Sequence, residues 1–521
     1  MIDRHTELVL RNSPAAARLL TPDALERLAN ELTDLRQRLK SAESELAPLL
    51  EKVHPENLPS ARNFIHYLAL RRYDIRDLQQ RLARAGLSSL GRSESHVLVT
   101  VDRILELIAL ARGEAIPAAD GEPVGFREGE RILADNAVRL LGPAPQHRLV
   151  RIMVTLPKEA ATDIELVKNL LSAGMNCARI NCARGDAAQW AAMIANIRAA
   201  QRELGLECRV LTDLGGPKLR TTEVIGRRKP LRLFAGNRFE LVRDGACECK
   251  GKRAPPRVGC DTPQVFEDAE VGQPIWFDDG RIGGIIEEKT AEGFYVQVTH
   301  AKPKGSKLRA ERGINLPETS LKIPLFSDKD RADLAAVAPL ADAIEMSFVQ
   351  REEQIDELHS ALDDLDADQL GVVLKIEKRS AFAELPRLIL AAMRRRSCGV
   401  MIARGDLAIE TGFERMAELQ EEILWIAEAA HVPTIWATQV LENLAKEGML
   451  SRAEVTDAAM SARAEAVMLN KGPFIIDAIR TLDDILGRMK EHQSKKRALY
   501  PALSVSESLW DVKGAPEPAR G

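Results

Sequence analysis

The sequence lacks any apolar run close to the ~18 residues that a membrane-spanning helix needs. Its start, MIDRHTELVL, also lacks the apolar core of a signal peptide. Only seven cysteines occur in 521 residues, which does not suggest a disulfide framework. We therefore expect a cytoplasmic protein that does not bind membranes.

Two common kinds of binding site are not indicated either. The nine histidines form no cluster with metal-ligand spacing. Cys247 and Cys249, with Cys260 nearby, could hold a metal, but no matching Cys or His pair follows, so free thiols are the better interpretation. The net charge of −4 gives no electrostatic reason to expect a nucleic-acid partner.

Residues 1–145 have the pattern of a helical region. Thr21 suits an N-cap and Pro22 a first helical position. The apolar residues that follow at three- and four-residue spacing are Leu28, Leu32, Leu35 and Leu39. More helices are expected within 61–87, 95–113 and 126–142. The region is either an assembly module, through which the protein forms a homo-oligomer, or a helical cap on the next domain.

From residue 148 the pattern alternates between strands and helices. Strands are predicted at 149–154, 177–181, 208–214, 342–348, 372–377, 399–404, 433–438 and 466–470. Helices are predicted at 162–173, 187–204, 350–362, 380–395, 413–430 and 474–490. Eight strands with intervening helices predict an α/β fold, a (β/α)8 TIM barrel.

The gap after the third strand has a different pattern. Residues 222–317 carry Gly, Pro and short alternating runs, which predict a small β-barrel inserted as a lid. The expected domains are a helical region at 1–145, the barrel at 146–221 and 318–490, the lid at 222–317, and a tail at 491–521. In the tail we expect Leu509 and Trp510 to pack against the body of the protein.

Charged residues stand at the ends of two predicted strands. Lys375 and Glu377 share one face of a strand because side chains two residues apart point the same way. Gly405 and Asp406 follow the next strand. An ammonium, two carboxylates and open backbone at strand C-termini suit a divalent metal and a phosphorylated acid. An ordinary strand-end salt bridge is the alternative.

The order of motifs over about residues 148–490 resembles the pyruvate kinase family. The motifs are GMNCARIN, TDLGGPKLRT, FDDGRI, RGINLPE, EMSFVQ, LKIEKRSAF, MIARGDLAIE, PTIWATQVLENL and SRAEVTD. The resemblance implies phosphoryl transfer from phosphoenolpyruvate to ADP, giving pyruvate and ATP. It also implies a barrel with a lid inserted after the third strand.

The resemblance also implies roles for individual residues. Glu377 and Asp406 would hold Mg2+ or Mn2+, and Lys375 would stabilise the transferring phosphoryl group. Arg179 would bind the substrate phosphate, and the backbone N–H groups of Gly405 and Asp406 its carboxylate. Thr438 would bind the same carboxylate, and Arg220 would add positive charge at the barrel mouth.

The monovalent-cation site departs from the family pattern. Asn181 and Asp213 are present, but Ala183 and Leu214 stand where the family has hydroxyl residues. Lys218 replaces an acidic residue, and family members with lysine there resemble potassium-independent forms. We therefore expect that K+ is not required. The alternative is that Lys218 is a surface lysine.

The nucleotide side departs further. The first strand leads into Thr155-Leu156-Pro157-Lys158 instead of a glycine-proline turn, and Arg184 replaces a histidine. The eighth strand leads into a shortened loop, Asn470-Lys471-Gly472-Pro473. Glu311-Arg312 replaces the lysine pair of the lid, so Arg184 and Arg312 are tentative nucleotide contacts.

Three functions remain open at this point. The first is pyruvate kinase chemistry with ADP. The second is a related enzyme acting on phosphoenolpyruvate or a 2-oxo acid with another acceptor. The third is a non-catalytic metabolite sensor. The family's C-terminal effector domain is not found after residue 490, so we expect no regulation through it.

Overall fold

The computed structural model describes residues 21–116, 123–225, 230–244, 255–324, 326–495 and 497–498. Its centre is a closed barrel of eight parallel strands, each paired with its neighbours along the chain and the last with the first. The strands are β1 (Arg151–Thr155), β2 (Cys177–Asn181), β3 (Arg209–Asp213), β13 (Ala343–Met346), β14 (Gly371–Ile376), β15 (Cys398–Ala403), β16 (Thr434–Ala437) and β17 (Ala466–Leu469). The predicted TIM barrel is confirmed, with every strand within two residues of its expected bounds.

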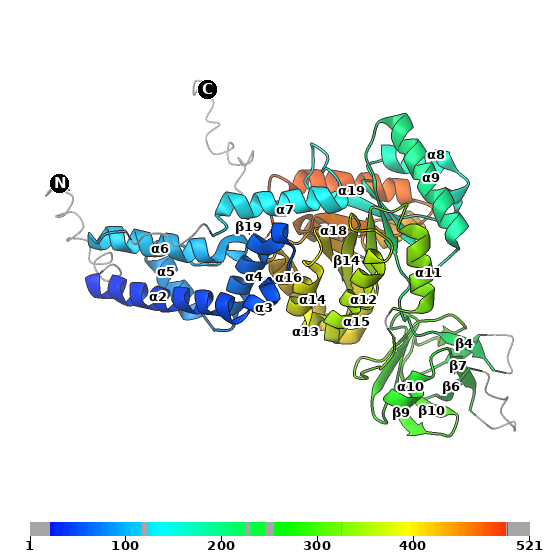
Figure 1. Ribbon diagram of the computed structural model, residues 1–521. Coiled ribbons are helices and arrows are strands. Elements are labelled where there is room, and N and C mark those ends of the chain that lie inside the picture. The colour runs from blue at the N-terminus through cyan, green and yellow to red at the C-terminus, as the bar shows by residue number, and fades with distance from the viewer. Residues whose placement is uncertain are drawn as a thin grey trace, which may run out of the picture.

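Helices cover the outside of the barrel (Figure 1). The main ones are α8 (Ile164–Ser172), α9 (Ala187–Leu204), α11 (Asp328–Val337), α12 (Glu352–Asp363), α13 (Arg379–Ala383), α14 (Leu385–Ala392), α16 (Met416–Ala429) and α19 (Ile475–Met489). The single helix predicted at 380–395 is in fact two, because Pro386 stands in the first turn of α14. Proline has no N–H to continue a preceding helix, but is accommodated where a new one begins.

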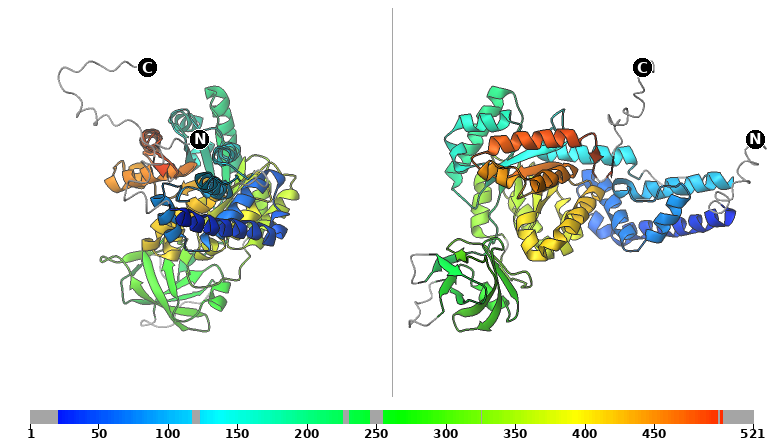
Figure 2. Two further views of the ribbon diagram at one scale, coloured as in Figure 1. Left: turned by 90° about the vertical axis from the view of Figure 1, so that its left-hand side faces the viewer. Right: turned by 180° about the vertical axis from the view of Figure 1, so that it is seen from behind.

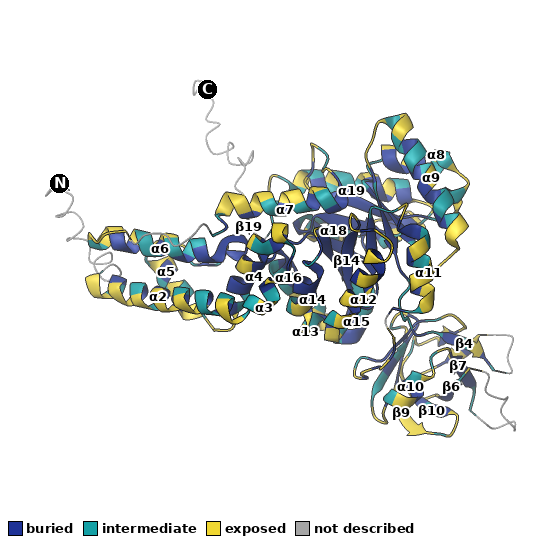
Figure 3. Cartoon of the chain, viewed as in Figure 1, coloured by how far each residue is buried: buried dark blue, intermediate teal, exposed yellow. Residues whose placement is uncertain are grey.

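Strand alternation sends one row of side chains inward. Met153, Leu211, Ala343, Val373 and Met401 form an apolar cluster inside the barrel. Their strand neighbours Ile152, Val210, Ile344, Val372 and Val400 pack in the outer core beneath the helices. All eight strands are therefore almost wholly buried (Figure 3), and polar side chains on the inward row lie at the barrel mouth or within it.

The lid is a separate β domain between β3 and α11. Its seven-stranded sheet contains β4 (Thr221–Val224), β6 (Arg238–Arg243), β7 (Arg257–Cys260), β8 (Pro274–Phe277), β9 (Ile282–Lys289), β10 (Gly293–His300) and β12 (Ile314–Asn315). A two-stranded ribbon, β5 (Leu231–Leu233) with β11 (Ser306–Leu308), accompanies it. We expected a small barrel, and the two edges of this mostly antiparallel sheet, β12 and β4, do meet. Arg220 and Gly313 form an antiparallel bridge there, and the backbone N–H groups of Thr221 and Ile314 donate to the carbonyls of Arg312 and Leu219. Phe239, Phe277 and Phe294 lie in its own core.

The N-terminal region consists of α2 (Pro22–Glu45), α3 (Ala47–Leu50), α4 (Leu58–Arg71), α5 (Arg76–Arg84), α6 (Val97–Arg112) and α7 (Phe126–Leu141). The side chain of Thr21 accepts a hydrogen bond from the Ala24 backbone N–H, so the predicted cap is confirmed. Helices α2, α5 and α6 project from the barrel as an arm, well away from the lid (Figures 1 and 2).

Helix α7 closes the end of the barrel at which the strands begin, opposite to the barrel mouth. Leu140 and Leu141 join the apolar cluster inside it. Gly371 is the first residue of β14 and Gly399 the second of β15, and a Cβ on either would lie within 2.5 Å of a Leu140 methyl carbon. The two glycines therefore make room for the leucine, and part of the helical region serves as a cap.

Buried polar contacts join the helical region to the barrel. His431 is fully buried just before β16 and lies 2.9 Å from Ser60 Oγ and 2.9 Å from the Ser95 carbonyl oxygen. The Asn63 side chain donates to the carbonyl of Ala429 at 2.8 Å. These contacts bind α4 and the short 3-10 helix before α6 (Glu94–His96) to the end of α16 and to the residues before β16.

Some sequence predictions concern regions outside these elements. Cys247, Cys249, Leu509 and Trp510 lie outside the described residues. Cys260 is buried and is not in a disulfide. Within the described part of the chain, no helix is long and apolar enough to cross a membrane. The described His, Cys, Asp and Glu residues also form no group of three or more arranged for a metal ion.

Candidate active site

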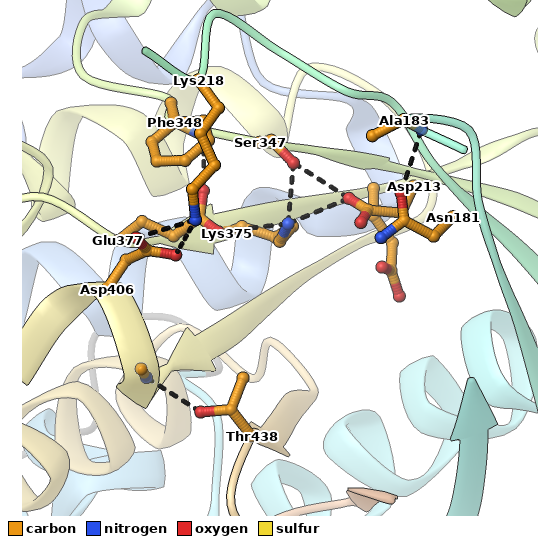
Figure 4. A network of polar contacts seen from close by, with 12 residues as sticks. Asn181, Ala183, Asp213, Lys218, Ser347, Phe348, Lys375, Glu377, Asp406 and Thr438 are labelled. Atoms are coloured by element: carbon orange, nitrogen blue, oxygen red, sulfur yellow. Dashed lines mark hydrogen bonds and ion pairs between the residues drawn. The ribbon is translucent and has the colours of Figure 1, made fainter. Parts of the chain in front are cut away.

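The carboxyl ends of β2, β3, β13 and β14 bring four charged side chains together inside the barrel mouth, referred to below as the charged cluster: Arg179, Asp213, Glu345 and Lys375. Figure 4 shows Asp213 and Lys375 with Ser347 and Glu377 beside them. Lys375 Nζ lies 2.9 Å from Asp213 Oδ1, 2.7 Å from Ser347 Oγ and 3.1 Å from Glu377 Oε1. Ser347 Oγ also donates to Asp213 Oδ1 at 2.9 Å. The ammonium is therefore held in a fixed position by three oxygen atoms from three strand ends.

Arg179 lies beside this group on β2. Its Nε lies 2.9 Å from Glu345 Oε2, its Nη1 donates to Thr155 Oγ1 at 3.0 Å, and its Nη2 pairs with Asp213. Burial opposes the charge of the guanidinium, but Asp213 and Glu345 outweigh it and raise the pKa of Arg179. Arg179 is therefore a permanently charged donor at the mouth of the barrel.

The two predicted metal ligands lie at the ends of β14 and β15. Lys218 Nζ lies 3.1 Å from both carboxylate oxygens of Asp406, and Glu377 Oε2 accepts from the Phe348 backbone N–H at 2.6 Å. Burial raises the pKa of Glu377. For Asp406 burial is outweighed by the Lys218 ammonium and by hydrogen bonds, so its pKa is lowered.

This donor set fits a divalent ion such as Mg2+ or Mn2+. The available atoms are hard carboxylate oxygens, and Mg2+ is commonly held by one or two carboxylates with the remaining positions left to water and substrate oxygens. In the structure each of these oxygens contacts a protein donor. Metal binding at Asp406 would therefore require the Lys218 ammonium to move.

Thr438 follows β16 with a backbone φ of +68°, and Gln439 and Leu441 after it also have positive φ. A β-branched residue rarely adopts this conformation, and such strain is often associated with a functional site. Thr438 Oγ1 accepts a hydrogen bond from the Gly405 backbone N–H at 2.8 Å. The two groups predicted to receive a substrate carboxylate thus bond to each other here, at the start of α15 (Arg404–Thr411).

The predicted monovalent-cation ligands are all engaged by protein groups. Asn181 Oδ1 accepts from the Ala183 backbone N–H at 2.9 Å. Both oxygens of Asp213 are contacted, one by Lys375 and Ser347 and the other by Arg179. Lys218 contacts Asp406 and the ring of Phe348, with Nζ 5.6 Å from the ring centroid, not Asn181 or Asp213.

A cavity of about 330 Å3 opens between the ends of β1, β2 and β17. Among the described residues, its lining includes no Asp or Glu. It includes five cationic side chains, those of Lys158, Arg179, Arg184, Lys446 and Lys471. Burial and then the nearby Arg184 lower the pKa of Lys471. This cavity, referred to below as the cationic pocket, suits an anionic ligand.

The structure does not bring every predicted residue into this cluster. Arg220 donates to the Glu311 carbonyl at 3.4 Å, and Arg312 lies 3.3 Å from Asp278, so their contacts are with the lid. The lid nevertheless reaches the site through Asn315, whose Nδ2 lies 3.4 Å from Asp406 Oδ1.

Glu345 and Ser347 were missed by the sequence argument. Both lie within the EMSFVQ motif, on the inward row that begins with Ala343. The two-residue alternation of a strand could have placed them beside Lys375 and Arg179.

The chain is similar in sequence to known proteins over this same region. Residues 142–473 match the family model described as pyruvate kinase, barrel domain. A pyruvate kinase of Methylorubrum extorquens is 32% identical over 378 residues, covering 71% of this chain and 73% of that protein. Pyruvate kinase 2 of Trypanosoma brucei brucei is 32% identical over 335 residues, covering 63% and 64%.

A pyruvate kinase of Bacillus licheniformis is 29% identical over 375 residues, covering 70% of this chain. This chain spans only 62% of the length of that relative and 60% of one from Geobacillus stearothermophilus. The match nevertheless includes the barrel, the lid between its halves and every residue of the charged cluster. On this similarity and on the fold, the chain belongs to the pyruvate kinase family.

Proposed function

We propose that this protein transfers a phosphoryl group from phosphoenolpyruvate to ADP and releases pyruvate and ATP. The observation that carries the proposal is the fixed Lys375 ammonium on β14. Arg179 on β2, Glu377 directly after β14 and Asp406 on α15 lie around it. Cations held in place before the reaction stabilise the negative charge that a transferring phosphoryl group carries.

Each residue has a defined task in this proposal. Arg179 binds the donor phosphate and Lys375 stabilises the group in transit, so that the bond from phosphorus to the enol oxygen breaks as a terminal oxygen of ADP forms the new one. Thr438 and Gly405 bind the carboxylate of phosphoenolpyruvate, and Arg220 adds positive charge at the mouth. Thr438 then lies near the carbon of the enolate that takes up a proton to give pyruvate.

Glu377 and Asp406 would hold Mg2+ or Mn2+, which when bound neutralises negative charge on phosphoryl and enolate oxygens. The Lys375 ammonium already supplies positive charge at Asp213, one of the predicted monovalent-cation ligands, and the Lys218 ammonium supplies it at Asp406 in the absence of a metal. We therefore propose that K+ is not required. We also propose that the protein acts in the cytoplasm, as a homo-oligomer assembled through its N-terminal helices.

The cationic pocket supports a second candidate, an acceptor other than ADP. Arg184 lines this pocket, whereas Arg312 pairs with Asp278 in the lid. The loop after β17 contributes Lys471. An acceptor with more negative charge than ADP would therefore also suit the pocket.

The experiment is to measure pyruvate formation from phosphoenolpyruvate with Mg2+, in the presence and absence of ADP and of K+. Turnover that depends on ADP and not on K+ is expected. Turnover that requires K+ would overturn the potassium proposal alone. Metal-dependent binding of phosphoenolpyruvate without turnover would favour another acceptor or a sensor.

A further inference from the structure

Besides Asp213, the charged cluster contains a second carboxylate, that of Glu345. Glu345 is fully buried on β13 and shares the inward row with Ala343 and Ser347. In the strand register it is the direct partner of Asp213 on β3. Two acidic side chains thus stand next to each other in a region where a buried carboxylate is costly unless it is paired.

Glu345 is paired with Arg179. Its Oε2 lies 2.9 Å from Arg179 Nε, while its Oε1 has no hydrogen-bond partner among the described residues. Burial, with the nearby charge of Asp213 acting against the attraction of Arg179, raises the pKa of Glu345 to about 7. Burying this carboxylate therefore costs folding free energy, although an apolar side chain at the same position would also fill the barrel.

The contact with Glu345 determines how the guanidinium lies. Nε contacts Glu345, while Nη1 and Nη2 contact Thr155 and Asp213. Three of the five N–H groups of the arginine are thus used, which leaves two for a ligand. Because the three partners come from three different strands, the plane of the guanidinium is fixed, and Arg179 lines the cationic pocket.

We propose that Glu345 is a positioning residue for the phosphoryl donor: it holds Arg179 by Nε, so that the two remaining N–H groups face the donor phosphate. The inference rests on the proposed function, because it assigns Arg179 to that phosphate. Glu345 touches no substrate and acts only through Arg179. The alternative is a buried ion pair that only stabilises the barrel, and the two roles predict different kinetics.

The test uses Glu345→Gln in the full chain, with Glu240→Gln as the matched control. Glu240 is also buried and lies 2.9 Å from an arginine Nε, that of Arg257, but it is in the lid. For Glu345→Gln, we expect KM for phosphoenolpyruvate and its Kd in the presence of Mn2+ to rise about tenfold, since a charge-assisted contact is lost. KM for ADP should stay within about twofold, because only binding of the donor is affected.

A double-mutant cycle with Arg179→Met separates positioning from stability. If Glu345 acts through Arg179, Glu345→Gln should weaken phosphoenolpyruvate binding no further in the Arg179→Met background. Equal Kd values for wild type and Glu345→Gln would overturn the inference. The inference would also be overturned if Glu345→Gln and Glu240→Gln lowered the melting temperature and the affinity for phosphoenolpyruvate by equal amounts, because the loss of affinity would then follow from lost stability.

The donor-binding readout keeps the two proposals distinguishable. If the wild type binds phosphoenolpyruvate but forms no pyruvate with ADP, the proposed reaction fails, and the ratio of Kd values still decides the role of Glu345. If the wild type forms pyruvate and Glu345→Gln has an unchanged KM, the reaction stands and the inference fails. If the wild type does not bind phosphoenolpyruvate, both are overturned.

Discussion

Lys218 Nζ lies 3.1 Å from each carboxylate oxygen of Asp406. An internal ammonium thus occupies the charge-neutralising position on a proposed metal ligand. A divalent cation at Asp406 and the Lys218 ammonium would repel each other at such short range. The lysine and the metal are therefore expected to compete in the absence of substrate.

The first prediction is that Lys218→Met increases the affinity for Mn2+ about threefold to tenfold without substrate, because the competing charge is removed. Titration calorimetry measures the change. Lys378→Met is the control, since Lys378 lies 3.6 Å from Glu410, close to the site but not in contact with Asp406. An equal increase in affinity in both variants would mean that the lower positive charge near the site is the cause, and would contradict direct competition between Lys218 and the metal.

The second prediction separates catalysis from metal binding. Lys375→Met should lower kcat by about a thousandfold, the size of effect seen when a preorganised electrostatic contact is lost. Its Mn2+ affinity should not fall, because both proposed carboxylate ligands are kept and the ammonium 3.1 Å from Glu377 Oε1, which would repel the ion, is removed. Steady-state kinetics and metal titration measure the two effects.

Glu377→Ala is the counterpart of this variant. It removes one of two proposed ligands, so Mn2+ affinity should fall at least tenfold, while Lys375 keeps its contacts with Asp213 and Ser347. Wild-type turnover in Lys375→Met would refute the role of the lysine. Unchanged metal affinity in Glu377→Ala would place the ion elsewhere.

The third prediction concerns the packing of α7 against the end of the barrel at which the strands begin. Gly399→Ala should destabilise the protein by about 1–3 kcal/mol, because the added Cβ would lie 2.5 Å from Leu140 Cδ2. Leu140→Ala should cost about 2–5 kcal/mol through the cavity that it leaves. The double variant should be more stable than the sum of the two losses implies, because the cavity left by Leu140→Ala makes room for the Cβ added at residue 399. Chemical denaturation measures all three, and strict additivity would show that the residues do not meet.

The fourth prediction is a pH dependence of stability from His431. Burial lowers the pKa of His431 to about 4, whereas an unfolded histidine titrates near ~6.5. Since the unfolded chain takes up the proton first, His431 supports the fold fully above about pH 6.5. Between about pH 6.5 and 4 the protein should lose roughly 3 kcal/mol from this one residue.

Denaturation of wild type and His431→Gln at pH 4.5, 5.5 and 7.5 tests this. The variant should be less stable at pH 7.5, because it loses the neutral ring that accepts from Ser60 Oγ and donates to the Ser95 carbonyl. The difference between the two proteins should shrink as the pH falls. A constant difference would mean that His431 is not the group that titrates.

The barrel could be predicted because its signals are local. Each barrel strand is a short apolar run. The N-terminal helices are equally local in their signals, since Pro22 marks the start of α2 and Gly113 the end of α6. The break at Pro386 could also have been read from the sequence, since proline marks the start of α14.

The site could be predicted only where a motif carried it. Lys375, Glu377 and Asp406 were found from their strand ends, but the partner of Lys218 was not. Residues 218 and 406 are brought together by closure of the barrel, and nothing in either local sequence specifies the contact. The same holds for Glu345 and Arg179, whose pairing depends on side-chain reach across neighbouring strands.

The fit of Leu140 against Gly371 and Gly399 has a consequence for anyone who trims this protein. The match to the family's barrel-domain model begins at residue 142, two positions after that leucine. A fragment that began at residue 142 would keep every proposed site residue. It would lose Leu140 and Leu141, which fill the barrel at the end where its strands begin. The residues that match the barrel-domain model and the residues that the barrel needs for its packing therefore begin at different positions, and recombinant fragments should start before α7.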